Sequence, residues 1–332
     1  MKRALVLGAT GHIGAHVVRA LLARGYDVRA TYHHPTYLFV LEGLPIERVA
    51  VDLWDPSSLR RALEGCQLVF HCAGYYPRFT ERRSRAMARG IAQTQQVCET
   101  LREARLERIV YTSSTATIAQ APGRLATEAD GEPWPLTVWK PLYATVKIAM
   151  EHEVRRYASQ GLPVVIVNPS VCVGEYDAHP FSGRLVLLFA KRRLPCIIEH
   201  RFNATYTGDV GVGHVLAAER GRVGERYLLA AHNVSLSEWA LMIAEAAGVR
   251  PVRRQLPRAI AMAVAGLTEV AAAVTRTEPL LPRRAVGMAQ FGQRLDGSKA
   301  QREFGWAPTP LDEAIRRAVA WFRQHHYLST KH

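Results

Sequence analysis

The chain has 332 residues, 48% of them hydrophobic, which suffices for one large α/β domain or two smaller ones and excludes a globally disordered chain. Its five cysteines are odd in number and include no Cys-x-x-Cys pair, which favours reduced thiols over a disulfide scaffold or a zinc site. The formal net charge of +14 fits an anionic substrate or surface, but no nucleic-acid-binding signature accompanies it, so nucleic acid is not an expected partner.

The N-terminus predicts neither a leader nor a membrane span. Met1-Lys2-Arg3 runs directly into an apolar segment. No apolar run reaches the roughly 20 residues that a bilayer-spanning helix needs. We therefore expect a cytoplasmic protein without stable membrane insertion.

A glycine-rich turn, Gly8-Ala9-Thr10-Gly11-His12-Ile13-Gly14, separates an apolar run at 4–7 from an amphipathic stretch at 13–24. Strand, glycine turn and helix in this order are typical of a dinucleotide site. Gly8 permits the tight turn, Gly11 lets the backbone approach a pyrophosphate, and Gly14 lets the helix pack on the strand. The free N–H groups and the positive dipole end of the helix would face phosphate.

Strands and helices then alternate up to residue 168. We expect strands at 27–32, 47–52, 67–73, 108–114 and 162–168, with helices at 55–65, 82–104 and 141–160. The almost continuously apolar run at 67–73 is typical of a parallel strand covered on both faces. This order predicts an α/β fold with a Rossmann-type, doubly wound parallel sheet.

Beyond residue 168 the alternation becomes irregular. We predict that residues 1–168 form the dinucleotide-binding domain, to which some later segments return. Residues 169–332 would form mainly a smaller C-terminal substrate-binding domain. A strongly apolar helical stretch at 259–275 is interrupted by Thr268 and Glu269, which favours a lid or core helix over a membrane span. A helix lying at a membrane interface is the alternative.

The segment Tyr143-Ala144-Thr145-Val146-Lys147 places a phenol and an ammonium one turn apart on one helix face. The neighbouring cation favours the phenolate, so we expect a lowered Tyr143 pKa, suited to proton transfer. A second Tyr-x-x-x-Lys, formed by Tyr327 and Lys331, lies at the chain end outside any βα unit, and we interpret it as coincidence.

Ligands in an open α/β sheet bind beyond the carboxyl ends of the strands. Several polar or small residues follow predicted strands and can meet in one cleft there: the glycine-rich turn, Asp52, Ala73-Gly74, Ser113-Ser114 and Asn168-Pro169. In such a cleft a serine and a tyrosine can hydrogen-bond a substrate carbonyl. The tyrosine would pass a proton while a nicotinamide passes hydride.

The chain thereby resembles the extended short-chain dehydrogenase/reductase superfamily, the NAD-dependent epimerase/dehydratase family. The resemblance rests on the Gly-x-x-Gly-x-x-Gly turn, the Ser…Tyr-x-x-x-Lys set, Asn168-Pro169-Ser170 with Val173-Gly174, Thr207-Gly208-Asp209-Val210 and Phe304-Gly305-Trp306-x-Pro308. It extends over nearly the whole length. Within the superfamily, the chain is most similar to the dihydroflavonol reductase-like and hopanoid-associated sugar epimerase-like branch.

The resemblance implies that Ser114 and Tyr143 are catalytic, with Ser113 as the alternative to Ser114, and that Lys147 binds the nicotinamide ribose and tunes Tyr143. No metal is expected, because the histidines lack metal-ligand spacing. Relatives commonly dimerise through two helices of the nucleotide domain, so the resemblance allows a homodimer, but the sequence does not fix the oligomeric state. The expected cofactor-binding residues are Gly8, Thr10, Gly11, His12, Ile13, Gly14, His33, Asp52, Leu53, Ala73, Gly74, Tyr143, Lys147, Asn168, Pro169 and Ser170.

The chain departs from the family pattern after the second predicted strand. NAD-preferring members carry an acidic residue there, which holds the ribose 2′-hydroxyl, whereas this chain reads Ala30-Thr31-Tyr32-His33-His34. Without that carboxylate a 2′-phosphate is not repelled, and Arg29 or the histidines could contact it. We therefore prefer NADP over NAD as the cofactor.

Two further departures concern the catalytic region. The helix after the fourth strand reads Gly90-Ile91-Ala92-Gln93-Thr94 and lacks the asparagine that many relatives carry there, which removes a common structural link to the catalytic site. Ser114-Thr115-Ala116 lacks the acidic residue expected of a sugar-nucleotide dehydratase, so dehydration is not expected.

A basic segment follows the fourth strand and should overhang the cleft: Tyr75-Tyr76-Pro77-Arg78, then Arg82, Arg83, Arg85 and Arg89. It is either a clamp for an anionic substrate or a solvated helix face. The same two interpretations, anion binding or a solvated surface, apply to Arg192-Arg193 and Arg253-Arg254. The side chains of Trp134 and Trp139 either line a pocket or pack in the core. His71 and Cys72 are expected to be buried strand residues, and His179, His200 and His214 lack metal-ligand spacing.

Together these features predict an NAD(P)(H)-dependent oxidoreductase acting on a ketone or secondary alcohol of a small-molecule substrate. A nucleotide-sugar epimerase with a tightly held cofactor is the first alternative. A non-catalytic NADP-binding regulator is the second, and the intact Tyr143 and Lys147 weigh against it.

Overall fold

The computed structural model describes residues 2–77, 81–121, 123–131, 142–275, 286 and 293–328. Its main element is a seven-stranded parallel sheet in the order β3-β2-β1-β4-β5-β6-β9. The strands are β1 (Arg3–Leu7), β2 (Asp27–Tyr32), β3 (Glu47–Ala50), β4 (Leu68–His71), β5 (Arg108–Thr112), β6 (Val164–Pro169) and β9 (Arg226–Leu229). Strand order reverses between β1 and β4, which is the switch point where doubly wound sheets bind ligands.

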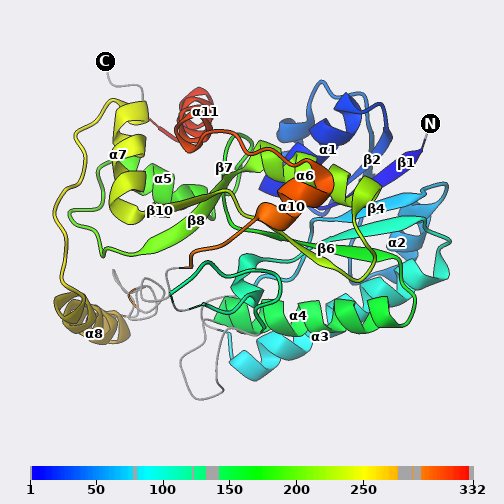
Figure 1. Cartoon of the computed structure of the whole chain (residues 1–332), viewed down its shortest axis with the longest axis horizontal. Helices are drawn as coiled ribbons and strands as arrows, with labels where there is room; N and C mark the ends of the chain where they lie inside the picture. The colour runs from blue at the N-terminus through cyan, green and yellow to red at the C-terminus, as the bar shows by residue number, and fades with distance from the viewer. Residues whose placement is uncertain are drawn as a thin grey trace.

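Helices cover both faces of this sheet (Figure 1). On one face α1 (His12–Ala23) packs against α6 (Thr207–Arg220), and on the other α3 (Arg83–Glu103) packs against α2 (Pro56–Leu63) and α4 (Leu142–Ser159). The strands alternate accordingly, because successive side chains point to opposite faces. Ala4 and Val6 belong to the core beneath α1, whereas Leu5 and Leu7 belong to the core beneath α3.

A smaller three-stranded sheet has the order β10-β8-β7. Its strands are β7 (Val171–Val173), β8 (Arg201–Tyr206) and β10 (His232–Ser235). Around it lie α5 (Gly183–Ala190), α7 (Leu236–Ala247) and α11 (Leu311–Gln324), while α8 (Arg258–Thr275) lies at the periphery of the molecule and α10 (Ser298–Phe304) beside α6 (Figure 1). The short helices η1 (Pro35–Leu41) and η2 (Thr115–Thr117) complete the described elements.

The predicted strands and helices up to residue 168 are confirmed, with ends that differ by at most two residues. Two later segments return to the large sheet: α6 packs on α1, and β9 pairs with β6. Arg78, Trp134 and Trp139 lie outside the described residues, so the roles expected of them stay predictions.

Candidate active site

The glycine-rich turn has backbone positions that only glycine fits. Gly8 has φ +77°, and a Cβ there would lie 2.9 Å from Ala73 Cβ. A Cβ at Gly14 would lie 2.1 Å from the Gly8 carbonyl oxygen, closer than any van der Waals contact. Gly11 is the N-cap of α1 and offers no side-chain cap, and the first turn contains no acidic residue. The first N–H groups of α1 are thereby left to an anion, as a dinucleotide site requires.

His12 connects this turn with the segment that follows β7. Its Nδ1 lies 3.8 Å from an Asp177 carboxylate oxygen, and burial lowers the pKa of the imidazole. Its Nε2 is buried without a hydrogen-bond partner among the described residues. A buried polar atom next to the phosphate-binding turn needs a partner, which a bound cofactor can supply.

At the adenosine end, the structure corrects one expectation. Arg29 is not available to a 2′-phosphate, because its Nε donates to Glu47 on the adjacent strand at 2.8 Å and its Nη1 donates to the Ala62 and Glu64 carbonyls at 2.7 and 2.8 Å. His34 Nδ1 accepts from the Thr36 N–H at 3.3 Å and so caps η1. His33 and His34 are both exposed after β2, and of the two only His34 caps η1.

Asp52 and Leu53 lie directly beyond β3, where an adenine would lie. The Trp54 N–H donates to Asp52 Oδ1 at 2.9 Å, and Gln96 on α3 donates to the Leu53 carbonyl at 2.8 Å. These two bonds fix the course of the loop. They leave the Asp52 side chain exposed.

The structure brings Ser114, Tyr143, Lys147 and Gly74 together beyond β4 and β5. Ser114 is the second residue after β5, and a side-chain hydrogen bond from Ser114 lowers the pKa of Tyr143 in the first turn of α4. One turn later, Lys147 reaches back so that its Nζ lies 3.5 Å from the position of a Cβ on Gly74. A lysine at this place can contact a ribose that lies along Ala73 and Gly74.

The pKa of Tyr143 corrects a second expectation. Burial raises the pKa of Tyr143, and hydrogen bonding from Ser114 and Tyr76 offsets only part of that rise. Lys147 is not among the groups that lower the Tyr143 pKa, and burial lowers the pKa of the lysine itself to about 8. Desolvation disfavours the charged form of both groups, so Tyr143 is a protonated phenol at neutral pH.

Two exposed aromatic residues flank Tyr143. The Tyr76 ring stacks on the Tyr143 ring with centroids 5.7 Å apart, and the Phe181 ring lies 6.1 Å from Tyr143 and 6.0 Å from Tyr76. Tyr76 is 54% exposed and Phe181 is 68% exposed. Tyr76 thus lies against Tyr143, and the predicted role of its segment in covering the cleft stays a prediction. Phe181 was not predicted, since nothing near it in the sequence marks it as part of the site.

The basic segment after β4 makes several contacts with the protein itself. Arg83 donates to the Thr145 hydroxyl on α4 at 2.9 Å. Arg89 lies 4.0 Å from a Glu81 carboxylate oxygen and 5.4 Å from the centre of the Tyr75 ring. These contacts fix the start of α3 against α4, and the anion clamp stays a prediction.

A buried carboxylate, Glu151, lies one further turn along α4. It accepts hydrogen bonds from the Ser113 hydroxyl, from Thr117 Oγ1 at 2.8 Å and from Asn168 Nδ2 at 2.8 Å. Arg226 at the start of β9 adds an ion pair at 3.2 Å. Glu151 is only 2% exposed. We define these five residues as the Glu151 network.

The Glu151 network decides how the two serines are oriented. Ser113 points its hydroxyl to Glu151, and Ser114 is the serine that meets Tyr143. Glu151 was missed by the sequence reasoning, although the signal was present: Tyr143, Lys147 and Glu151 follow one another at intervals of four and share a helix face.

Asn168 and Ser170 contact the protein rather than an open cleft. The Asn168 amide also donates to the Ser114 carbonyl at 3.1 Å, and the Ser170 hydroxyl shares a hydrogen bond of 2.8 Å with Thr205. Their cofactor contacts, and that of Pro169 in β6, stay predictions. Gly90 has a clear packing reason, because a Cβ there would lie 2.9 Å from Val146 on α4.

The histidines of this region are neutral structural residues. Burial lowers the pKa of His71 to about 3. His214 lies between Thr112 Oγ1 at 2.8 Å and the Val210 carbonyl at 2.7 Å, and burial lowers its pKa to about 4. The prediction that His71 is a buried strand residue is confirmed, but Cys72 lies just beyond β4 and is only partly buried. In the part of the chain that the structure describes, no group of three or more His, Cys, Asp or Glu residues is arranged to hold a metal ion.

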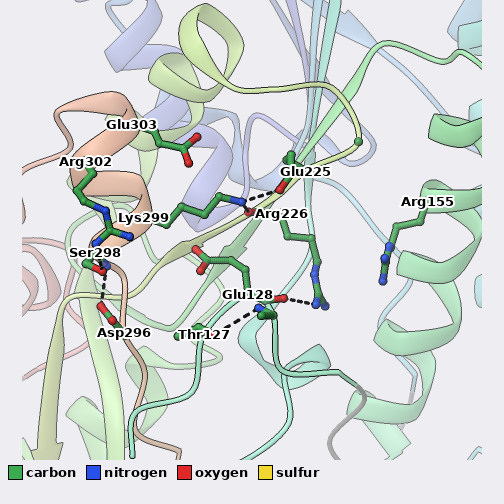
Figure 2. Close-up of a pocket in the computed structure, with 12 residues that line it drawn as sticks. Thr127, Glu128, Arg155, Glu225, Arg226, Asp296, Ser298, Lys299, Arg302 and Glu303 are labelled. Carbon is green, nitrogen blue, oxygen red and sulfur yellow. Dashed lines mark hydrogen bonds and ion pairs between the residues drawn. The ribbon is translucent and has the colours of Figure 1, made fainter.

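A cavity of about 540 Å³ lies between β9, α10 and the 127–129 loop, next to the Glu151 network, whose Arg226 is among the lining residues (Figure 2). Its charged lining is balanced: Lys299 bonds to Glu225 at 2.7 Å, and Arg226 bonds to the Glu128 carbonyl. None of the predicted site residues lines it. Charges that already satisfy one another give no reason to assign a ligand here.

Comparison with known proteins agrees with this geometry. The family model of the NAD-dependent epimerase/dehydratase family matches residues 4–230. The chain belongs to this family. The sterol demethylase protein B of Methylococcus capsulatus is 33% identical over 96% of this chain and 98% of its own length. A protein of Synechocystis sp., provisionally named as a dihydroflavonol 4-reductase, is 32% identical over 98% of this chain and 96% of its own.

Solved structures extend the likeness. A nucleoside-diphosphate-sugar epimerase from Pseudomonas aeruginosa is 31% identical, covers 99% of each chain and has a TM-score of 0.82. The Bacillus cereus UDP-glucuronic acid 4-epimerase in complex with NAD shares the fold at 19% identity, with a TM-score of 0.74. The protein is thus an NAD(P)-dependent enzyme of the extended short-chain dehydrogenase/reductase type. Among the described residues, no helix is both long and apolar enough to cross a membrane.

Proposed function

We propose that the protein is an NAD(P)(H)-dependent oxidoreductase that interconverts a ketone and a secondary alcohol on a small apolar, ring-bearing molecule. The observation that carries the proposal is the contact of Ser114 with Tyr143 beside Lys147 at the carboxyl ends of β4 and β5. Ser114 would orient the substrate oxygen. Tyr143 would exchange a proton with it, and Lys147 would bind the nicotinamide ribose.

The cofactor would be held by the turn at Gly8, Gly11 and Gly14 and by the N-terminus of α1, because the turn is so tight that a Cβ at Gly8 or Gly14 would clash with the protein itself, and the first N–H groups of α1 are free for a pyrophosphate. When bound, it supplies or accepts hydride at the carbon that bears the substrate oxygen. Burial raises the pKa of Tyr143 and keeps it protonated, which suits donation of a proton to a ketone oxygen. Reduction is therefore the direction that the site favours near neutral pH.

The substrate class is inferred from Tyr76 and Phe181. Both rings are exposed beside Tyr143, so an apolar ring could pack between them and place its carbonyl at Ser114. Relatives named for dihydroflavonol and sterol chemistry are consistent with such a substrate. NADP is the preferred cofactor, because residues 30–34 contain no carboxylate and His33 is exposed at the end of β2.

The test is turnover of a panel of ring ketones with NADPH or NADH, followed by the near-ultraviolet absorbance of the reduced nicotinamide. We expect net consumption of cofactor with at least one ketone. Conversion of a nucleotide sugar to its epimer without any net change in absorbance would identify an epimerase instead. Cofactor binding without any turnover would identify a regulator. Titration of protein fluorescence with NADP(H) and NAD(H) tests the cofactor preference, which tighter NAD(H) binding would refute.

A further inference from the structure

The helix α8 presents a purely apolar face to solvent. Its exposed residues include Ile260 at 50%, Leu267 at 72% and Val270 at 66% exposure. At 100° per residue these positions and the exposed Ala259, Ala263 and Val264 fall on one side of the helix. Between residues 259 and 272, no exposed side chain is polar. A surface helix normally shows the opposite pattern, with charged residues facing water.

The opposite side of α8 is anchored to the rest of the molecule. Ala261 and Ala265 are fully buried and pack with Ile198 and Leu256. Leu256 in turn donates its N–H to the Ile197 carbonyl at 2.8 Å, and Ile197 donates to the Arg254 carbonyl at 2.9 Å. The helix therefore has one buried face, which packs on the protein, and one exposed apolar face, which we call the open face. The two faces are formed by different residues, so the buried face already accounts for the packing of α8 on the described residues.

A cluster of arginines lies on the segments that support α8. Arg192, Arg250, Arg253 and Arg254 line one hollow together with Leu194, Pro195, Pro251 and Val252, and no carboxylate lines it. All four arginines are exposed, and in the described part of the chain none of their guanidinium groups forms an ion pair. Guanidinium groups bind phosphate well, because their planar fork matches its oxygens.

The backbone at Arg192 supports a role for this cluster. Arg192 follows α5 with φ +53°, a left-handed conformation in which glycine is less strained. Its N–H donates to the Phe189 carbonyl, and the Arg193 N–H donates to the Leu188 carbonyl, both at 2.9 Å. Arg192 therefore occupies a left-handed backbone position that glycine would adopt at a lower conformational cost.

We propose that α8 and the four arginines form one docking surface for an anionic lipid bilayer. The apolar face of α8 would enter the boundary between headgroups and acyl chains, and the arginines would contact headgroup phosphates. The combination of an apolar helix face with adjacent positive charge is what interfacial binding requires. The net charge of +14 attracts the whole protein to such a surface. This inference is independent of the proposed reaction.

The experiment is flotation of the full-length protein with vesicles of phosphatidylcholine alone or of equal parts phosphatidylcholine and phosphatidylglycerol. We expect binding to the anionic vesicles that weakens as salt is added. Leu267→Glu should weaken binding by about tenfold or more, because it places a carboxylate in the apolar face. Val270→Glu is a second variant of the same kind. Val223→Glu, in the exposed turn before β9, makes the same change elsewhere and should leave binding unaltered.

The arginines are tested by the double variant Arg253→Gln/Arg254→Gln, which should weaken binding by about tenfold. Its control is Arg61→Gln/Arg105→Gln, which removes the same charge from exposed positions outside the surface and should have a much smaller effect. Thermal unfolding and NADP(H) binding report whether each variant is folded, without reference to turnover.

Several outcomes would overturn the proposal. Wild-type protein that stays unbound, or binds phosphatidylcholine alone equally well, would do so. So would α8 variants that bind as tightly as wild type. If the wild-type chain self-associates in ultracentrifugation and Leu267→Glu makes it monomeric, with neither binding vesicles, the surface belongs to a second copy of the chain and the lipid proposal is wrong.

Discussion

The helices α4 and α8 have the same length, and each reverses the usual pattern of a surface helix. α4 buries charged side chains, with Lys147 3% exposed and Glu151 2% exposed. α8 exposes large apolar ones, with Leu267 72% exposed and Val270 66% exposed. Buried polar groups and exposed apolar patches are the informative departures from the rule that hydrophobic residues lie inside. The two helices show such departures in opposite directions.

The difference lies in where each departure finds its partner. The buried carboxylate of α4 is satisfied inside the chain by the Glu151 network, and Tyr143 and Lys147 on the same face lie at the predicted cofactor cleft. The apolar face of α8 is exposed and meets no partner within the described residues, and the proposed partner is a lipid surface. Buried polar residues that bond to one another, as on α4, indicate a catalytic or binding site. An exposed apolar face, as on α8, indicates a surface that binds a partner.

The largest effect is expected at the start of α4. Tyr143→Phe removes the proton donor and should lower turnover by about 1,000-fold while leaving cofactor binding nearly unchanged. Steady-state kinetics and fluorescence titration measure the two quantities. Tyr327→Phe is the matched control at the second Tyr-x-x-x-Lys, because the Tyr327 hydroxyl donates to the Ala178 carbonyl at 2.6 Å and has a structural role. Equal activity losses in both variants would refute the assignment.

The next effect concerns the Glu151 network. Glu151→Gln leaves Arg226 without its charge partner in a buried site, so we expect the free energy of unfolding to fall by about 3 kcal/mol. Urea denaturation measures it. Glu153→Gln, two residues further along α4, breaks an exposed-side ion pair with Arg156 and should cost less than about 1 kcal/mol. Similar losses for the two variants would show that the network contributes no special stability.

A smaller effect is expected from Lys147, with a characteristic pH dependence. Burial lowers the pKa of Lys147 from 10.5 to about 8, so the charged lysine destabilises the folded state at neutral pH. Lys147→Met should raise the free energy of unfolding by about 2 to 3 kcal/mol at pH 7. The wild-type protein should recover this difference as pH rises from about 8 to 10.5, where only the unfolded chain still binds the proton. Urea denaturation of the cofactor-free protein across pH checks it, and a constant difference would contradict the burial of a charged lysine.

The smallest effect is expected on α8. Leu267→Ser should change the free energy of unfolding by less than about 0.5 kcal/mol, because the side chain already faces solvent. Val146→Ser on α4 is the contrasting variant, since Val146 is fully buried and should cost about 3 kcal/mol. Thermal or urea unfolding compares the two. A large loss in Leu267→Ser would mean that the open face of α8 is covered.

The parts of the site that the sequence predicts are those with short-range signals. The glycine turn between β1 and α1 and the pair Tyr143 and Lys147 are each defined by residues a few positions apart. The position of Arg29 was misjudged because its partner Glu47 lies on a neighbouring strand. Phe181 reaches Tyr143 only through the tertiary fold, and the Tyr143 pKa depends on how deeply the fold buries it. Such long-range contacts leave no local pattern to read.

The ion pair between Glu151 and Arg226 also constrains how the site assembles. Glu151 belongs to α4, but its cationic partner belongs to β9, which joins the large sheet beside β6 after the smaller sheet has begun. Until β9 has docked, a chain emerging from the ribosome would hold that carboxylate without its cation, a costly arrangement in a closed core. The charge partner of Glu151 on α4 therefore becomes available only when about two thirds of the chain has been made. A protein truncated at residue 168 would contain every proposed catalytic residue and still lack the strand that completes their support.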